Sequence, residues 1–238
     1  MFDFRDQVVI VTGAAGNLGS VTARAFREAG ARLVLIDHRL ARLEEQFGDL
    51  QDDDSGPILA DVDLTDSGAV ESMIFEVVQQ LGDIDVLVNI AGGFRSGTPV
   101  HETSIDAWQY MLDLNARTVL IMARAVVPHM LQQKSGKTVN VASRSALQGR
   151  ANAAAYAAAK SAVVRLTESM SAELKEAGIN VNCIIPGTLD TPQNRAAMPD
   201  ASFEKLVQPA AIGDVILFLT SQRARALHGA CVPAYGLT

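Results

Sequence analysis

The stretch VVIVTGAAGNLG, residues 8–19, decides the fold. A β-branched run at 8–12 leads into a loop with three glycines, and the residues after the loop place apolar side chains at the spacing of a helix face. A glycine loop between a strand and a helix lets backbone N–H groups approach a pyrophosphate, which the helix N-terminus favours. The stretch predicts a dinucleotide-binding unit, although a tight turn without a ligand has the same pattern.

Outward from this unit, strand-like runs alternate with helical patterns. The expected strands lie at 8–13, 32–37, 56–62, 85–92, 137–143, 180–186 and 230–235. The longest helical patterns cover roughly 105–132 and 151–177, and a shorter one covers 209–221. We predict an α/β fold, a doubly wound Rossmann-type parallel sheet of about seven strands with helices on both faces, in a single domain over 1–238.

The least regular segment, at about 187–208, follows the strand expected at 180–186. Ligands of open α/β sheets bind at the carboxyl ends of the strands, so we predict a substrate-binding loop here rather than a linker. Met198, Phe203 and Leu206 would line its pocket, or would pack as an ordinary helix face.

The composition narrows the class of partner. A net charge of −7 and a pI near 5.1 argue against nucleic-acid or anionic-membrane binding, and favour a small-molecule substrate. No apolar run is long enough to cross a membrane, and the N-terminus lacks a secretion signal, so we expect a cytoplasmic protein. The two cysteines, Cys183 and Cys231, have no metal-ligand or disulfide pattern, and we expect two small buried side chains and no metal.

Asp37 ends the second expected strand, eighteen residues after Gly19. A carboxylate at this place can accept hydrogen bonds from both hydroxyls of an adenosine ribose and would repel a 2′-phosphate. We therefore predict NAD rather than NADP as the cofactor. Arg39, two residues later, keeps NADP open, and Asp37 has the alternative role of capping the next helix.

Ser143, Tyr156 and Lys160 are the candidate catalytic residues. Tyr156 and Lys160 are four residues apart in an alanine-rich helix, so they share a face. A nearby ammonium would lower the pKa of the phenol from about 10 toward the working range of an acid–base group. The Ser143 hydroxyl would hydrogen-bond a substrate oxygen. Tyrosine and lysine at this spacing also occur on ordinary helix surfaces.

In combination these motifs resemble the short-chain dehydrogenase/reductase family, over nearly the whole chain. The resemblance rests on TGAAGNLG (12–19), Asp37, DLTD (63–66), NIAG (89–92), Asn115, Ser143, Tyr156, Lys160 and PGTLDT (186–191). It implies that Tyr156 exchanges the proton, that Lys160 lowers the pKa of Tyr156 and binds the nicotinamide ribose, that Ser143 orients the substrate oxygen, and that Asn115 holds a water linking Lys160 to solvent.

The same resemblance implies a set of cofactor-binding residues. Asp63 and Leu64 would flank the adenine. The residues on the adenosine side would be Asn89, Ala91 and Gly92, and those at the nicotinamide would be Pro186, Gly187, Leu189 and Thr191. NIAG and PG are also ordinary strand-end turns. The implied cofactor-binding residues are Gly13, Gly16, Asn17, Leu18, Gly19, Asp37, Asp63, Leu64, Asn89, Ala91, Gly92, Tyr156, Lys160, Pro186, Gly187, Leu189 and Thr191.

The chain departs from the family pattern at three places. Glycine stands at 16 and asparagine at 17, a spacing typical of the longer, epimerase-like branch; Asn17 would let the loop close because asparagine tolerates a left-handed backbone. Ile90 replaces a second asparagine, and the chain ends PAYGLT. These departures bear on which subfamily the chain resembles and not on the chemistry that the resemblance implies. An epimerase or dehydratase would need a longer substrate domain after residue 190.

The implied function is an NAD(H)-dependent oxidoreductase that interconverts a carbonyl and an alcohol, with a ketone, 3-oxoacyl or polyol substrate. AGGF (91–94) and the stretch 189–203 also resemble dihydropteridine reductases, so a pteridine is an alternative, although that group typically lacks a serine at the position of Ser143. An alternative of another class is a non-catalytic NAD-binding sensor, which would commonly lack some of these catalytic side chains.

Six alanines surround Tyr156 in its helix, at 153–155 and 157–159. Small residues let another helix approach closely, and alanine also has high helix propensity. The family resemblance implies a homo-oligomer, a tetramer or a dimer, assembled partly on this helix.

Overall fold

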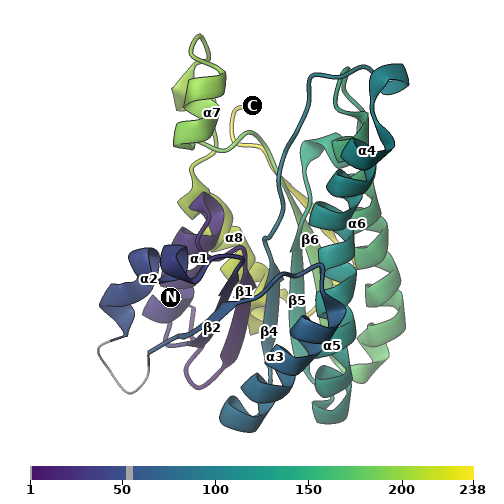
Figure 1. The fold of residues 1–238 in the computed structure, drawn as a ribbon. Helices are drawn as coiled ribbons and strands as arrows, with labels where there is room; N and C mark the ends of the chain where they lie inside the picture. Colours follow the sequence, from purple (N-terminus) through teal and green to yellow (C-terminus); the bar gives the residue numbers. More distant parts are fainter. Residues whose placement is uncertain (1, 52–55) are drawn as a thin grey trace.

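The computed structural model describes residues 2–51 and 56–238, and contains one parallel sheet (Figure 1). Its strand order is β3-β2-β1-β4-β5-β6-β7, and every neighbouring pair is parallel. The predicted doubly wound sheet is confirmed. The strands are β1 Val8–Thr12, β2 Arg32–Asp37, β3 Ile58–Asp61, β4 Val86–Asn89, β5 Gly136–Val141, β6 Ile179–Pro186 and β7 Cys231–Ala234.

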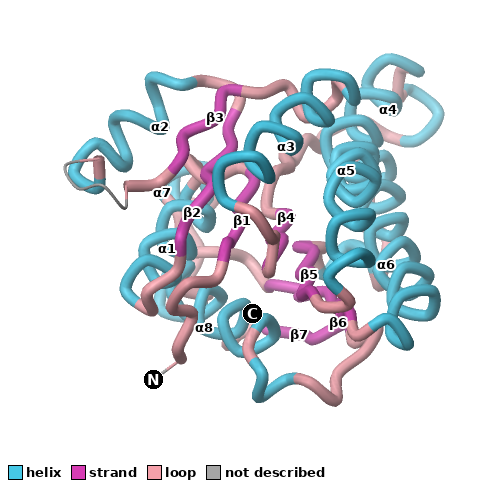
Figure 2. Tube along the Cα trace, turned by 90° about the horizontal axis from the view of Figure 1, so that it is seen from below, coloured by secondary structure: helices cyan, strands magenta, loops and turns pink. Residues whose placement is uncertain are grey.

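Helices cover both faces of the sheet (Figure 2). The α-helices are α1 Asn17–Glu28, α2 Leu40–Phe47, α3 Ser67–Leu81, α4 Ile105–Leu112, α5 Thr118–Gln133, α6 Ala154–Leu174, α7 Pro192–Ala197 and α8 Pro209–Thr220. Short 3₁₀ turns lie at Gly48–Leu50, Val100–Glu102, Arg144–Ala146, Lys175–Ala177, Phe203–Lys205 and Gln222–Ala224. Within the described residues no helix has the length and apolar character needed to cross a membrane.

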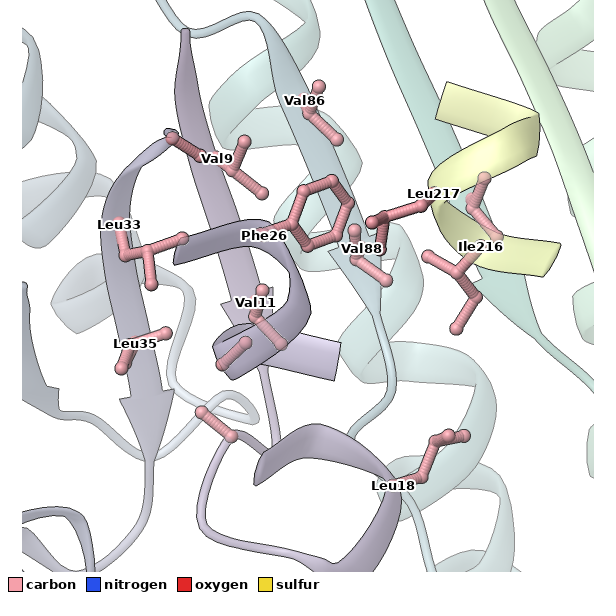
Figure 3. Packing of buried hydrophobic residues seen from close by; sticks show 14 of the residues in the cluster. Val9, Val11, Leu18, Phe26, Leu33, Leu35, Val86, Val88, Ile216 and Leu217 are labelled. Carbon is pink, nitrogen blue, oxygen red and sulfur yellow. The ribbon is translucent and has the colours of Figure 1, made fainter. Parts of the chain in front are cut away.

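Alternate residues of the central strands enter two separate cores. Val9 and Val11 pack with Phe26 of α1 and with α8, as Figure 3 shows. Val8 and Ile10 point the other way, into the layer of α3, α5 and α6. Because both faces are covered, the strands read as continuous apolar runs rather than as an alternation of apolar and polar residues.

The helix expected over 105–132 contains a π-helical turn, Asp113–Arg117, between α4 and α5. The Asn115 amide donates to the Met111 carbonyl at 3.1 Å, and the Thr118 hydroxyl donates to the Leu114 carbonyl at 3.1 Å. Side chains that bond carbonyls four residues earlier compete with the backbone ladder. The pattern of apolar residues does not reveal such a turn.

The segment 187–208 is more regular than expected, because it contains α7. Thr191 caps this helix by accepting a hydrogen bond from the Asn194 N–H at 3.2 Å, and Pro192 occupies its first position. A parallel bridge between Leu189 and Val207 joins the two ends of the segment. The expected loop is therefore a short helix, α7, in a segment whose two ends are joined by a β-bridge.

Candidate active site

The predicted site residues follow the carboxyl ends of the strands, which meet at one edge of the sheet. The glycine loop follows β1, the NIAG turn ends β4, Ser143 follows β5 and the PG turn follows β6. α4, α7 and the C-terminus lie at this end of the molecule (Figure 1). The register sets Thr12 beside Asn89, and Asn89 beside Asn140, so these segments are lateral neighbours.

Thr12 joins the glycine loop to the turn after β4. Its hydroxyl oxygen accepts hydrogen bonds from the N–H groups of Ile90 and Ala91, both at 3.1 Å. Gly13 has a φ of 65°, and a Cβ there would lie 2.8 Å from the Ala91 Cα. Only glycine fits this left-handed position against the neighbouring backbone. This role of Thr12 is not evident from the TGAAGNLG motif, of which Thr12 is the first residue.

The backbone of the loop closes without a left-handed residue at 17, so that expectation was wrong. Asn17 is the first residue of α1, and its amide donates to the Gln193 side chain of α7 at 2.9 Å. Gly16 is the N-cap residue of α1, and among the described residues no side chain caps this helix end. By contrast, Asp66 caps α3 and Ser104 caps α4. The first-turn N–H groups of α1 are therefore available to an anion.

Gly19 lies where α1 crosses the loop. A Cβ there would lie 2.8 Å from the Ala14 Cα and 2.9 Å from the Ala14 carbonyl oxygen, and closer still to the Gly13 carbonyl oxygen. All three atoms belong to the backbone, so a side chain at position 19 would fit only if α1 moved away from the loop.

We expect Gly19→Ala to weaken dinucleotide binding at least about tenfold and to lower the melting temperature, because the clash displaces the α1 N-terminus. Calorimetric titration with NADH and a thermal melt measure both effects. Gly48→Ala is the matched control, since nothing lies within 4 Å of a Cβ at Gly48. Wild-type affinity and melting temperature in Gly19→Ala would refute the steric argument.

Asp37 lies beneath the glycine loop. Its carboxylate is buried and accepts hydrogen bonds from the Ala15 N–H at 3.2 Å and from the His38 N–H at 2.9 Å. The alternative capping role is wrong, because the N-cap residue of α2 is Arg39 and Asp37 makes no capping bond to this helix. The carboxylate is thus fixed beside the loop at the end of β2.

Asp63 and Leu64 serve the turn that follows β3. The Asp63 carboxylate accepts hydrogen bonds from the Thr65 N–H at 2.9 Å and the Thr65 hydroxyl at 2.7 Å, and these bonds lower the pKa of Asp63. Leu64 is buried in the core on the α3 side. Local structure accounts for both side chains, and their contact with an adenine stays a prediction.

Asn89 directs its side chain into the protein. Its amide donates to the Asn140 side chain at 2.8 Å, and the Asn140 amide donates to the Thr167 hydroxyl at 2.9 Å. This buried chain of polar groups connects β4, β5 and α6. Asn140 and Thr167 could not be identified from the sequence, because a polar residue in an apolar strand carries no sign of its partner.

Lys160 is almost fully buried beneath the site. Its ammonium donates to the Val141 carbonyl at 2.8 Å, and burial lowers the pKa of Lys160 to about 8. A Cβ at Gly92 would lie 3.3 Å from the Lys160 Nζ and 2.7 Å from the Asn115 Oδ1. Gly92 thus leaves the room in which Lys160 and Asn115 approach the turn after β4.

Asn115 fixes this turn to the helical layer. Its amide donates to the Gly93 carbonyl at 3.0 Å, and its side-chain oxygen accepts from the Gly93 N–H at 3.2 Å. Asn115 is fully buried in the π-helical turn, a feature that recurs at functional sites. The water expected beside Asn115 stays a prediction.

Tyr156 and Ser143 are hydrogen-bonded neighbours. Burial raises the pKa of Tyr156, and a hydrogen bond with the Ser143 side chain opposes this rise. The structure shows no lowering of the pKa of Tyr156 by Lys160, whose ammonium is directed to the Val141 carbonyl. Ser143 also accepts a hydrogen bond from the Ser145 N–H at 3.2 Å, which fixes its side chain.

Phe94 forms an aromatic wall beside Tyr156. The two rings meet edge to face, with centroids 4.9 Å apart and an interplanar angle of 84°. Phe94 is 62% exposed, so most of its ring faces solvent. In the sequence Phe94 stands out only as part of the AGGF motif, because its contact with Tyr156 depends on how the loop after β4 returns to α6.

The turn after β6 packs against the C-terminal segment. The Gly187 N–H donates to the Ala234 carbonyl at 3.0 Å, and a Cβ at Gly187 would lie 2.8 Å from the Tyr235 carbonyl oxygen. Pro186 ends β6, Leu189 forms the bridge with Val207, and Thr191 caps α7. These positions lie at the site edge, and their contact with a nicotinamide stays a prediction.

The three apolar residues of the 187–208 segment differ in exposure. Leu206 is buried, whereas Met198 and Phe203 are half-buried. The Arg195 guanidinium lies 4.8 Å from the centre of the Phe203 ring. Leu206 therefore serves packing, and Met198 and Phe203 are the two that can contact a ligand.

Comparison with known proteins agrees with this geometry. The family model described as short chain dehydrogenase matches residues 7–202. Meso-2,3-butanediol dehydrogenase of Serratia marcescens is 35% identical, over 98% of this chain and 94% of its own. Cis-4-hydroxycyclohexanecarboxylate dehydrogenase of Sinomonas cyclohexanicum is 32% identical, over 98% and 96%. The crystal structure of carveol dehydrogenase from Mycobacterium avium in complex with NAD superposes with a TM-score of 0.91 at 26% identity, over 99% and 98%. The chain therefore belongs to the short-chain dehydrogenase/reductase family and is an oxidoreductase.

Proposed function

We propose that this enzyme interconverts a secondary alcohol and its carbonyl with NAD(H). The observation that carries the proposal is the grouping of Ser143, Tyr156 and Lys160 at the carboxyl edge of the sheet, the same edge at which the uncapped N-terminus of α1 lies. Relatives named as butanediol, hydroxycyclohexanecarboxylate and carveol dehydrogenases support an alcohol substrate.

The residues at this edge fit a dinucleotide. The N–H groups that open α1 suit a pyrophosphate, and the buried Asp37 carboxylate beside them suits ribose hydroxyls. Gly13 lets the glycine loop lie against the turn after β4, and Gly92 lets Lys160 and Asn115 approach the same turn. When bound, NADH would supply the hydride that reduces the substrate carbon.

The chain's own residues would handle the substrate oxygen and the proton. In reduction, the Tyr156 phenol gives its proton to the oxygen as hydride reaches the carbon, and in oxidation the phenolate takes the proton back. The Ser143 hydroxyl donates a hydrogen bond to the same oxygen and stabilises the charge that develops there. The Lys160 ammonium, which donates to the Val141 carbonyl, would turn to the ribose hydroxyls of a bound cofactor and would then favour the phenolate electrostatically.

An assay panel tests this function. Purified enzyme is mixed with NADH and ketones, 3-oxoacyl thioesters or quinonoid dihydropteridines, and with NAD and alcohols or polyols, while nicotinamide absorbance is followed. We expect turnover with at least one carbonyl–alcohol pair. The exposed Phe94 ring favours a flat substrate, so a pteridine is the second candidate, and exclusive activity with the pteridine would select it.

The NAD preference we propose rests on charge. We expect NADH to be preferred over NADPH by at least about tenfold in kcat/KM, because the Asp37 carboxylate repels a 2′-phosphate. Asp37→Asn keeps an oxygen that accepts from the Ala15 N–H but removes the charge. This variant should therefore lower the ratio of kcat/KM with NADH to kcat/KM with NADPH.

Asp61→Asn is the control for net charge, since Asp61 lies opposite Asp37 on the next strand and is exposed. Steady-state kinetics with both cofactors provide the ratio. A wild-type preference for NADPH would overturn the assignment.

We also propose a homo-oligomer, a tetramer or a dimer. Four of the six alanines around Tyr156 are buried within the chain, which leaves only Ala154 and Ala158 partly exposed on that stretch of α6. Support comes instead from α5, on which Leu120 and Leu131 are 46% and 42% exposed. Sedimentation showing only a monomer at micromolar concentration would contradict this assembly.

A further inference from the structure

The site is flanked by positive charge in a protein that is otherwise acidic. The loops 90–100 and 143–153 carry Arg95, Arg144 and Arg150, and neither loop contains an aspartate or a glutamate. These loops follow β4 and β5 and supply Phe94 and Ser143 to the site. With a net charge of −7 for the whole chain, this local excess of arginine runs against the overall composition.

The two loops form one rim. The Gly97 N–H donates to the Asn152 carbonyl at 2.8 Å, which ties the end of one loop to the end of the other. Phe94 packs on Tyr156 just before Arg95, and Arg144 directly follows Ser143. All three arginines therefore belong to the segments that surround the phenol and the serine.

None of the three arginines has an acidic partner among the described residues. Arginines elsewhere do pair, as Arg24 does with Asp49 at 2.9 Å. By contrast, the Arg95 guanidinium lies 4.1 Å from the centre of the Tyr110 ring and the Arg144 guanidinium 5.2 Å from that of Tyr235. An aromatic ring orients a guanidinium but leaves its N–H donors free for another ligand.

We infer that the substrate carries a carboxylate, bound at this rim by Arg144 together with Arg150 or Arg95. The inference rests on the proposed function, because it concerns the same site. A guanidinium presents paired donors that match the two oxygens of a carboxylate. Local positive charge also draws in an anion that the net charge of the protein would otherwise repel.

The test uses unreactive probes, so that binding is measured apart from turnover. Butyrate, benzoate and cyclohexanecarboxylate are each compared with the matching carboxamide, by calorimetric titration into the NADH-loaded enzyme. We expect at least one carboxylate to bind about tenfold or more tightly than its amide, and added salt to weaken only the carboxylate. Equal affinity of acid and amide in all three pairs, or no binding of any carboxylate, would overturn the inference.

Arginine variants then locate the charge. We expect Arg144→Gln to remove most of the preference for the carboxylate, and Arg150→Gln or Arg95→Gln to remove part of it. Arg223→Gln is the matched control, because Arg223 is an exposed arginine 5.4 Å from the Phe2 ring centre and lies outside both rim loops. A preference that survives all three rim variants would refute the assignment.

The binding of NADH to each variant separates substrate from cofactor. Unchanged NADH affinity in Arg144→Gln supports a substrate carboxylate. If NADH affinity instead fell as much as carboxylate affinity, the arginine would bind a cofactor phosphate, and the inference would be overturned. Failure of the alcohol and carbonyl panel, with the carboxylate preference intact, would instead count against the proposed function alone.

Discussion

Replacing Tyr156 with phenylalanine is expected to lower kcat by about a hundred- to ten-thousandfold, the usual contribution of a positioned acid–base group. The ring keeps its volume and its edge-to-face contact with Phe94, so the thermal melt should be nearly unchanged. Only the hydroxyl, and with it the hydrogen bond to Ser143, is lost. The kcat for the best panel substrate and the thermal melt measure these two effects, and NADH affinity shows whether the cofactor still binds.

Tyr110→Phe provides the control for this variant. Tyr110 lies on α4 beneath the Arg95 guanidinium and is 42% exposed, and we assign it no proton transfer. It should keep turnover within about twofold of wild type. If Tyr156→Phe did the same, the phenol would have no role in the chemistry.

Replacing Lys160 with methionine is expected to lower kcat/KM by about a hundredfold or more without unfolding the protein. Relief of the buried ammonium contributes about 3 kcal/mol to the free energy of unfolding at pH 7, and loss of the bond to the Val141 carbonyl removes about 1–2 kcal/mol. A net gain of about 1–2 kcal/mol follows. Urea unfolding and steady-state kinetics measure the two opposed effects.

The pH dependence of unfolding isolates the Lys160 ammonium. Its pKa in the folded protein is about 8, below the ordinary value of 10.5. Below pH 8 the lysine is charged in both states, so the full cost of burying the charge is present. Between these values the unfolded chain holds the proton and the folded chain does not, so wild-type stability rises with pH relative to Lys160→Met. A difference that stays constant over this window would contradict a buried, charged lysine.

Lys137→Met is the matched control for both measurements. Lys137 is also a buried lysine of lowered pKa, but it bonds the Asn180 side chain at the opposite end of β5. Relief of its burial should leave turnover intact. Equal losses of activity in the two lysine variants would show that the effect is not specific to the site.

The sheet, and the shared helix face of the candidate catalytic residues Tyr156 and Lys160, could be predicted because their signals are local in sequence. A continuous apolar run marks a strand that is covered on both faces, and Tyr156 and Lys160 share a face through helix geometry alone. The glycine loop could also be predicted, because Gly13 and Gly19 occupy positions at which a Cβ would clash with backbone atoms.

What the sequence could not provide depends on contacts between distant segments. Asn89, Asn140 and Thr167 form one buried polar chain across two strands and a helix, and no residue type announces its partner. The rise in the pKa of Tyr156 follows from burial, which no spacing reveals. Asn17 was misjudged because its place in α1 depends on where the helix begins.

The most direct test of the account follows deuterium from the cofactor to the substrate. Wild-type enzyme and Tyr156→Phe are incubated with NADH carrying deuterium at both hydrogens of the nicotinamide C4 and with each carbonyl of the panel, and the products are examined by mass spectrometry. We predict one deuterium on the carbinol carbon of at least one product, formed by wild type far faster than by the variant. Tight NADH binding without transfer to any carbonyl would contradict the account, and would identify a dinucleotide-binding protein that performs no hydride transfer.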